Sequence, residues 1–493
     1  ERPGRVRSVP VACGASRSDT PACPDPNAPH VRGEGQVVGG RGGGIGRAVL
    51  RCTAMIPEPR ATPVDDDGGQ ALPQPLVART VAVDPAELPA DLLDLLPPDG
   101  GLAWVRRGDG IVAWGELVRV GTAGTDRFAR AQDAWRAIVA HAVVRDEVRL
   151  PGTGPLAFGS FAFADASPAG GVLVVPRVVV GRRGSAAWIT TLDAAAVGAP
   201  SAALLTEPSP VVPPGAVTYA DGALDRAGWQ GAVAAAVAEI RSGRLDKVVL
   251  ARDVVARTEH PLDPRWVLRR LAADYRSCWT FAVDGLLGAT PELLVRSEKG
   301  LVTSRVLAGT IRRTGDDDAD LARAAILAHS SKDLEEHEYA VESLTHALEP
   351  FCSSTNVPET PFVLHLPNVL HLATDVTAVL ATDRGEPPTS LALAAALHPT
   401  AAVAGTPTAD ACALIARLEG MDRARYAGPV GWLGADGDGE WGIALRSAEI
   451  DPGDPHRLRL FAGCGIVSAS VPEAELAESE AKLEPMRHAL LDG

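Results

Sequence analysis

The stretch that decides the fold is WGIALRSAEIDPGDPHRLRLFAGCGIVSASVPEAELAESEAK, residues 441–482. Segments 441–450 and 458–470 are apolar and are separated by polar turn residues, so we expect two strands joined by a turn. The last segment begins at Val471, and a proline and an acidic first turn follow, as is typical of a helix N-terminus. The sequence therefore predicts two strands followed by a helix.

Charged side chains of this stretch are placed to meet. Glu475, Glu478 and Lys482 are spaced i, i+3 and i+7, so they share one face of the predicted helix. Arg446 lies late in the first predicted strand, and a Gly-Cys-Gly turn lies in the second. Such a set could hold an anionic substrate beside a hard cation. The alternative is a solvated, salt-bridged helix face.

Length and charge limit the class of protein. A chain of 493 residues that is 46% hydrophobic can bury a large core. The formal net charge of -15 argues against nucleic acid or an anionic membrane as the main partner. No apolar run is long enough to span a bilayer, and no signal peptide is evident. The seven Cys include no C-x-x-C pair and are odd in number, so we expect a reduced, cytoplasmic enzyme.

Composition divides the chain into three parts. Residues 1–54 are rich in Gly, Pro and Arg and show no sustained period, so we expect a disordered extension. Met55 is the first methionine, and we interpret it as the natural start, with the preceding residues not native. Residues 55–215 are strand-rich and include a predicted helix over 126–143. Residues 216–493 hold the polar groups and are the expected catalytic region.

Two polar residues stand in apolar surroundings in this third part. Lys247 opens the predicted strand LDKVVLARDVVA, either as a solvated strand end or as a desolvated general base. Glu292 lies in the apolar run GLLGATPELLV, where burial would raise its pKa and let it act as an acid. The alternative for Glu292 is a turn residue that faces water.

A second pair of carboxylates lies on the predicted helix SSKDLEEHEYAVESLTHAL. Asp333 and Glu336 are i, i+3 partners, as Glu475 and Glu478 are. Two helices that each offer two carboxylates suit Mg²⁺, which prefers oxygen ligands. His337 is adjacent, but no Cys/His spacing supports zinc, so we interpret it as a supporting or packing residue.

Ten segments of the chain follow the order of the motifs of one family. They are KVVLAR (247–252), GATPELLV (288–295), LAGTIRR (307–313), KDLEEH (332–337), HLATDV (371–376), LHPTAAVAGTP (397–407), YAGPVGW (426–432), IALRSAEI (443–450), AGCGIV (462–467) and E-x-x-E-x-x-x-K (475–482). On these segments the chain resembles the chorismate-utilising enzymes, which include isochorismate synthase, salicylate synthase and anthranilate synthase component I.

The resemblance implies a fold and a site. The implied fold is a large α/β (α+β) sandwich of antiparallel sheets with helices packed outside and the active site between the sheets. By motif match, Glu336 and Glu478 would bind Mg²⁺, and Asp333 and Glu475 would support them through water. Arg446 and Tyr426 would hold the enolpyruvyl carboxylate of chorismate. The other substrate-binding residues implied by the match are Gly309, Thr310, His371, Thr374, Gly463, Gly465 and Lys482.

One position separates the members of the family by nucleophile. Members that add water carry Lys in the KVVLAR position, whereas members that use ammonia carry Gln there, and this chain has Lys247. The resemblance therefore implies isochorismate synthase, with Lys247 as base, Glu292 as acid and Mg²⁺ as an electrostatic clamp. Ala308 stands where the aminodeoxychorismate synthases that form a covalent adduct carry Lys. Cys464 stands where Ala is common.

Three alternatives stay open. The first is salicylate synthase, which uses the same groups and also eliminates pyruvate. The second is a non-catalytic relative that binds a carboxylated ligand, and the third is glutamine-fed anthranilate synthesis. We expect chorismate as the small-molecule substrate, no nucleic-acid or membrane partner, no obligatory glutaminase subunit, a monomer, and a role in menaquinone or siderophore biosynthesis.

Overall fold

The computed structural model describes residues 75–491, apart from 195–197, 199, 201–208 and 384 and the side chains of Lys332 and Glu336. The predicted extension over residues 1–54 and the proposed start at Met55 lie outside these residues. Among the described residues, no helix combines the length and the apolar character needed to cross a bilayer.

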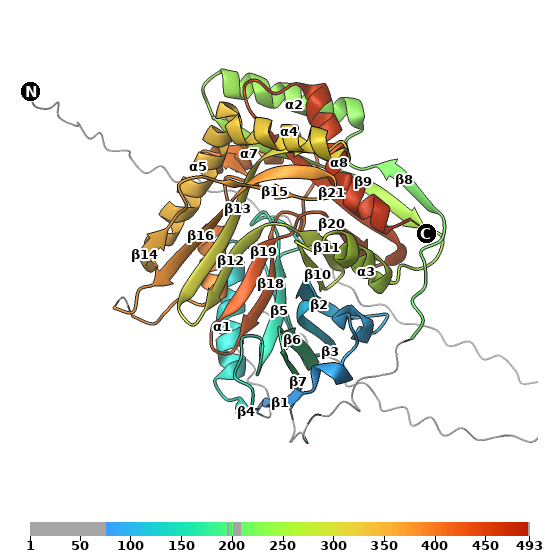
Figure 1. Cartoon of the computed structure of the whole chain (residues 1–493), viewed down its shortest axis with the longest axis vertical. Helices are drawn as coiled ribbons and strands as arrows, with labels where there is room; N and C mark the ends of the chain where they lie inside the picture. The colour runs from blue at the N-terminus through green and yellow to red at the C-terminus, as the bar shows by residue number, and fades with distance from the viewer. Residues whose placement is uncertain (1–74, 195–197, 199, 201–208, 384, 492–493) are drawn as a thin grey trace, which may run out of the picture. The chain divides into compact units, whose positions relative to one another are not determined.

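The strands up to residue 193 form the base of the molecule (Figure 1). They are β1 (Val77–Val83), β2 (Leu102–Arg106), β3 (Asp109–Thr122), β4 (Val143–Asp146), β5 (Leu156–Phe161), β6 (Gly171–Arg183) and β7 (Ala186–Asp193). Strand β6 is the centre of this base, because it pairs with β3 along one edge and with β5 and β7 along the other. Two short 3-10 helices, Pro85–Glu87 and Leu92–Leu95, precede β2.

Two further sets of antiparallel strands, called the first and second arms, extend the sheet from the base. The first arm starts where β2 pairs with β10, and the second starts where β5 pairs with β18. The first arm contains, in spatial order, β10 (Trp279–Val283), β11 (Leu286–Thr290), β20 (Ser447–Asp451), β21 (Asp454–Ile466), β9 (Lys247–Thr258) and, on the outer edge of β9, β8 (Val217–Asp221) and β17 (Gly405–Thr406). The second arm contains β18 (Pro429–Gly434), β19 (Gly439–Ile443), β12 (Leu293–Glu298), β13 (Leu301–Arg312), β16 (Val369–Leu380) and, on the outer edge of β16, β14 (Cys352–Asn356) and β15 (Phe362–His365).

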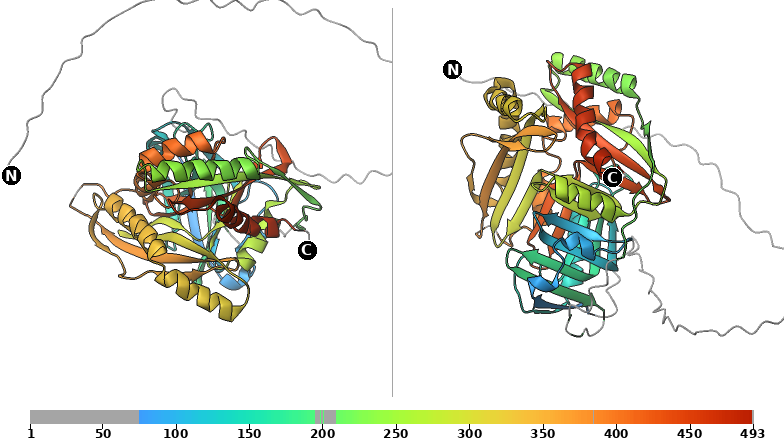
Figure 2. Two further views of the ribbon diagram at one scale, coloured as in Figure 1. Left: turned by 90° about the horizontal axis from the view of Figure 1, so that it is seen from above. Right: turned by 45° about the vertical axis from the view of Figure 1, so that its right-hand side comes forward.

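Helices cover the sheets (Figure 2). The first arm carries α2 (Arg226–Arg241), α3 (Pro264–Asp274), α7 (Thr408–Leu418) and α8 (Pro472–Ala489). The second arm carries α4 (Asp317–His329), α5 (Ser331–Leu348) and α6 (Ser390–Leu397), and α1 (Arg127–Val139) packs on the base. The predicted sandwich of antiparallel sheets with outer helices is therefore confirmed.

The chain crosses between the arms at two neighbouring points. It leaves β11 at Thr290 and enters β12 of the other arm at Leu293, and it leaves β19 at Ile443 and enters β20 at Ser447. The two crossings are hydrogen-bonded, since the Ile443 N–H donates to the Glu292 carbonyl at 3.2 Å. The single strand predicted over 441–450 is therefore wrong. Its residues belong to two arms, because pairing with distant strands sets the crossing, and the crossing leaves the apolar pattern of the sequence unchanged.

Two helix predictions have different outcomes. The helix predicted after Val471 is confirmed as α8, with Pro472 in its first turn, where a missing N–H costs no hydrogen bond. The helix predicted over 126–143 is wrong at its C-terminal end, because α1 ends at Val139. Val143 instead donates its N–H to the Leu76 carbonyl at 2.7 Å and starts β4.

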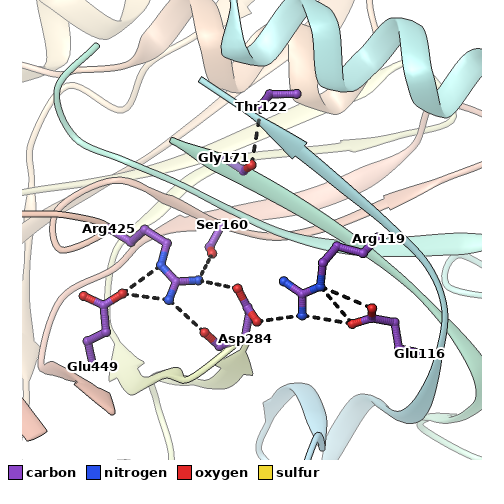
Figure 3. A network of polar contacts seen from close by, with 8 residues as sticks. All are labelled: Glu116, Arg119, Thr122, Ser160, Gly171, Asp284, Arg425 and Glu449. Atoms are coloured by element: carbon purple, nitrogen blue, oxygen red, sulfur yellow. Dashed lines mark hydrogen bonds and ion pairs between the residues drawn. The ribbon is translucent and has the colours of Figure 1, made fainter. Parts of the chain in front are cut away.

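A chain of ion pairs holds the base and the first arm together (Figure 3). Arg425 lies 2.7 Å from Glu449 of β20 and 3.2 Å from Asp284, the residue that turns the chain from β10 to β11. Asp284 also accepts a hydrogen bond from Arg119 of β3 at 2.8 Å, and Arg119 pairs with Glu116. Because each carboxylate meets an arginine, this partly buried set is electrostatically satisfied.

Candidate active site

A cavity of about 150 Å³ lies between the two arms, beside the crossings at Glu292 and Arg446. Its lining includes thirteen of the residues that the sequence predicts for the site: Lys247, Glu292, Gly309, Thr310, Asp333, His371, Tyr426, Arg446, Gly463, Gly465, Glu475, Glu478 and Lys482. Strands β9 and β21 and helix α8 supply one wall, and β13, β16 and α5 supply the other. The side chain of Glu336 lies outside the described residues.

Lys247 and Glu292 line the cavity from different elements, β9 and the crossing between β11 and β12. Lys247 is the first residue of β9 and is 8% exposed. Glu292 is 5% exposed, and burial raises its pKa to about 8, although the charges of Arg446, Lys247 and Lys482 oppose this rise. The carboxyl is therefore mostly protonated at neutral pH, in a cavity that also holds a lysine.

Arg446 is held by its backbone and by a hydrogen-bonded histidine. Its φ of 50° is in the left-handed region, which the turn between β19 and β20 requires. Its Nη2 donates to Nε2 of His371 at 3.1 Å, so we assign the ring proton of His371 to Nδ1, which lies 3.0 Å from the Thr310 hydroxyl. Burial and the charges of Arg446 and Lys482 lower the pKa of His371 well below its ordinary value. A neutral His371 can therefore orient the guanidinium without adding charge.

The face of α8 toward the cavity carries acids and a lysine. One ligand atom each from Cys464, Glu475 and Glu478 lies within 4.8 Å of the other two. The Lys482 ammonium lies 2.6 Å from a carboxylate oxygen of Glu478 and donates to the Gly463 carbonyl at 2.9 Å. Burial lowers the pKa of Lys482, but Glu478 and Cys464 together outweigh burial, and the net shift is upward.

This donor set fits a hard divalent cation. Burial raises the pKa of Cys464 well above its ordinary value, and the thiol donates to the Glu475 carbonyl at 3.3 Å. The sulfur therefore stays protonated, and carboxylate oxygens are the ligands that α8 offers, as a hard cation such as Mg²⁺ prefers. Asp333 lines the same cavity from α5.

Comparison with known proteins gives the family. Residues 104–491 match the family described as chorismate binding enzyme. The chain belongs to the chorismate-binding enzymes. It is 36% identical over 455 residues to the salicylate biosynthesis isochorismate synthase of Pseudomonas aeruginosa, covering 85% of this chain and 91% of that protein.

Solved structures agree with this membership. The structure of the menaquinone-specific isochorismate synthase MenF from Escherichia coli is similar with a TM-score of 0.69 at 27% identity, covering 86% of this chain and 96% of that one. The structure of a putative 2,3-dihydroxybenzoate-specific isochorismate synthase, DhbC, from Bacillus anthracis gives a TM-score of 0.66 at 31% identity, covering 81% and 98%. The resemblance to chorismate-utilising enzymes and the fold that it implied are thus confirmed.

One predicted residue of this chorismate-binding enzyme lies behind the cavity wall. Thr374 is absent from the residues that line the cavity, and its hydroxyl lies 2.7 Å from Nε2 of the buried His337. Gly309 brings the backbone close to the second pair of acids, because its φ is 78° and an added Cβ would lie 3.2 Å from Cβ of Asp333. Asp333 in turn accepts a hydrogen bond from the Ser330 hydroxyl that caps α5.

The sequence analysis missed one charged residue of the cavity wall. Arg423 is 3% exposed, lines the cavity and forms a 2.5 Å ion pair with the buried Glu419. The i, i+4 spacing of Glu419 and Arg423 could have indicated an ion pair. The same spacing is common on surface helices, so it does not indicate a buried pair at a cavity. Leu307, Ala402 and Val403 also line the cavity, but nothing in the sequence distinguishes them from other apolar residues.

Proposed function

We propose that this protein is an isochorismate synthase, which converts chorismate to isochorismate. The observation that carries the proposal is the pairing of Lys247 with a protonated Glu292 at one cavity. A base and an acid at one site suit a reaction that adds water at one ring carbon and expels hydroxyl at another. The names of the relatives support the same activity.

The substrate carries two carboxylates, and the cavity offers groups for both. We infer that Arg446 and Tyr426 hold the enolpyruvyl carboxylate, since a guanidinium fork matches carboxylate geometry. The ring carboxylate would lie toward α8, near Lys482 and the backbone of Gly463, Cys464 and Gly465, which the structure places within strand β21 and not in a turn.

We further propose that Mg²⁺ binds between α8 and α5. Glu478 would be a direct ligand together with Glu336, while Glu475 and Asp333 would act through water. When bound, Mg²⁺ would neutralise the ring carboxylate and so lower the cost of bringing a dianion into a cavity already lined by acids. The oxygen-rich donor set on α8 supports this choice.

The proposed reaction conserves atoms. Lys247 takes a proton from water as the water oxygen bonds to ring carbon C2. The ring double bonds shift, the bond from C4 to its hydroxyl breaks, and Glu292 gives its proton to the departing oxygen, which leaves as water. One water enters and one leaves, so the product is an isomer of the substrate.

The test is the product formed from chorismate and Mg²⁺, resolved by chromatography with and without ammonia. Isochorismate in an equilibrium mixture with chorismate supports the proposal. Salicylate plus pyruvate would move the protein to salicylate synthase, and an ammonia-dependent amino product would contradict the role given to Lys247.

Lys247→Ala separates an enzyme from a non-catalytic relative. In the enzyme, chorismate still binds and turnover falls by about 10²–10⁴-fold, the usual contribution of a general base. A pure binding protein would show no turnover before or after the change. We propose that the enzyme works as a monomer without a glutaminase subunit, in menaquinone or siderophore biosynthesis.

A further inference from the structure

Beside the cavity, none of the described strands pairs with one stretch of an edge of β9. On this edge β17 pairs with Lys247 and Val248, and β8 pairs with residues 254–258. The residues between these two pairings include Val249 and Ala251, both of which line the cavity. Backbone groups buried in this gap need hydrogen bonds from elsewhere.

The Val249 N–H still donates to the Ala404 carbonyl at 2.8 Å, and side chains bind the next backbone groups of the gap. The Ala251 N–H donates to Oε1 of Glu419 at 2.7 Å, and Nη2 of Arg423 donates to the Val249 carbonyl at 2.7 Å. The Ala251 carbonyl accepts from the indole of Trp229 at 3.3 Å. The side chains of Glu419 and Arg423 thus form the hydrogen bonds to β9 that a neighbouring strand would otherwise form.

The same arginine ties β9 to the segment that leads into β17 on the same edge. Nη1 of Arg423 donates to the Val403 carbonyl at 2.9 Å, while Nε and Nη2 contact Glu419. Four of its five N–H groups are therefore used within the protein. The guanidinium also lies 4.2 Å from the ring centroid of Phe163, which fixes its plane. Although Arg423 lines the cavity, four of its donors are committed to Glu419 and to two backbone carbonyls.

We propose that Glu419 and Arg423 are positioning residues, which hold the start of β9 so that Lys247 meets its substrate in the correct place. The proposal rests on the function proposed above. Lys247 is only two residues before the carbonyl that Arg423 holds, so a displacement of this edge moves the lysine. A shift of about 1 Å in a reacting group can lower a rate by about 100-fold.

A buried ion pair on α3 gives a matched control. Asp263 and Arg265 are also buried, lie 2.6 Å apart and use the arginine to bind backbone carbonyls, but neither lines the cavity. The test compares Arg423→Lys and the double variant Glu419→Leu/Arg423→Met with Asp263→Leu/Arg265→Met. For each protein, kcat and KM for chorismate, the midpoint of thermal unfolding and amide hydrogen exchange around Ala251 are measured.

We expect kcat to fall by about 10- to 100-fold in both Arg423 variants, with KM within about 3-fold of the wild type. Lysine keeps the charge but cannot reach Glu419, Val249 and Val403 together, so charge alone should not rescue the rate. The double variant should exchange the Ala251 amide faster. The control pair should lose thermal stability while kcat stays within about 2-fold.

Two results would overturn the proposal: a loss of kcat no larger than in the control pair, or a raised KM with unchanged kcat. If the wild type makes no isochorismate, the proposed function fails, but hydrogen exchange at Ala251 still tests whether the pair holds β9. If the wild type turns over and the variants behave as the control does, the positioning role alone fails.

Discussion

At the scale of single residues, the carboxyl of Glu292 shows how burial creates an acid. Its pKa of about 8 follows first from the loss of water around it, against the pull of three nearby cations. An ionised glutamate would have no proton to give to a leaving hydroxyl. The crossing between β11 and β12 therefore places a buried, protonated carboxyl where the proposed reaction needs a proton donor.

Glu292→Gln should lower kcat by about 10²–10⁴-fold without loss of the fold, because glutamine matches the shape of the protonated acid. In the wild type, kcat/KM should fall as the pH rises through about 8, because the reactive form is protonated. A pH profile of both proteins checks this. A variant that keeps wild-type activity, or a wild type without the alkaline limb, would contradict the role.

The same pKa has a consequence for stability. Folded Glu292 holds its proton up to a pH of about 8, whereas the unfolded residue loses it near 4.5. Its contribution to the free energy of unfolding is therefore full below 4.5 and is lost as the pH rises toward 8. Urea denaturation at several pH values should show a smaller decline for Glu292→Gln than for the wild type. An identical decline would contradict the shifted pKa.

At the scale of elements, Gly309 lets strand β13 approach helix α5. Its φ of 78° disfavours any side chain, and an added Cβ would press on Asp333 and Leu372. Gly309→Ala should cost about 1 kcal/mol or more of folding stability and should also weaken turnover, because Asp333 must move. Gly315 has a φ of 85° with no atom within 4 Å of the added Cβ, so Gly315→Ala is the control.

Gly315→Ala should lose a similar amount of stability and keep its activity. Thermal unfolding and steady-state kinetics on both variants decide the matter. Equal activity in the two variants would mean that the approach of β13 to α5 has no part in the site.

Helix α8 carries the proposed cation site, and binding should therefore stabilise the fold. Free Mg²⁺ at 100 times its Kd should add about 2.7 kcal/mol to the free energy of unfolding. Glu478→Gln should abolish most of this gain, whereas Glu484→Gln, on an exposed part of the same helix, should keep it. Thermal unfolding with Mg²⁺ and with a chelator measures the difference. A gain that survives Glu478→Gln would place the cation elsewhere.

Some of these elements are predictable from the sequence, and others are not. Helix α8 and strand β9 were predictable, because a proline-led acidic turn and an apolar run are local signals. The break at residues 444–446 was not, because it arises from pairing with β11 and β12, far away in the sequence. The roles of Glu419 and Arg423 were hidden for the same reason. Their partner atoms are backbone groups of β9, which carry no residue-specific signal.

At the scale of the whole molecule, the network around Arg425 fastens the first arm to the base (Figure 3). Arg425→Met leaves Glu449 without its arginine in a partly buried place, while Asp284 keeps Arg119, and should cost roughly 3–5 kcal/mol of stability. Arg183→Met removes a more exposed pair with Glu298 and should cost no more than about 1 kcal/mol. Urea denaturation of the two variants compares them, and equal losses would contradict the structural role of the network.

The site itself belongs to this largest scale. Its residues come from β9, β13, β16, β21, α5, α8 and the two crossings, so no local segment contains it. The ten sequence motifs nevertheless predicted most of the residues that line the cavity, because each motif lies at a point where the chain contacts the cavity. The chain is similar to relatives named for salicylate, menaquinone and 2,3-dihydroxybenzoate, so similarity alone does not choose a pathway.

In the proposed reaction, solvent water adds to the ring while the original hydroxyl leaves. Mass spectrometry of isochorismate formed from unlabelled chorismate in water enriched in ¹⁸O tests this step. We expect one ¹⁸O atom in the product, at the hydroxyl on C2. Isochorismate without label would mean that the hydroxyl migrates within the substrate, and it would contradict the roles given to Lys247 and Glu292.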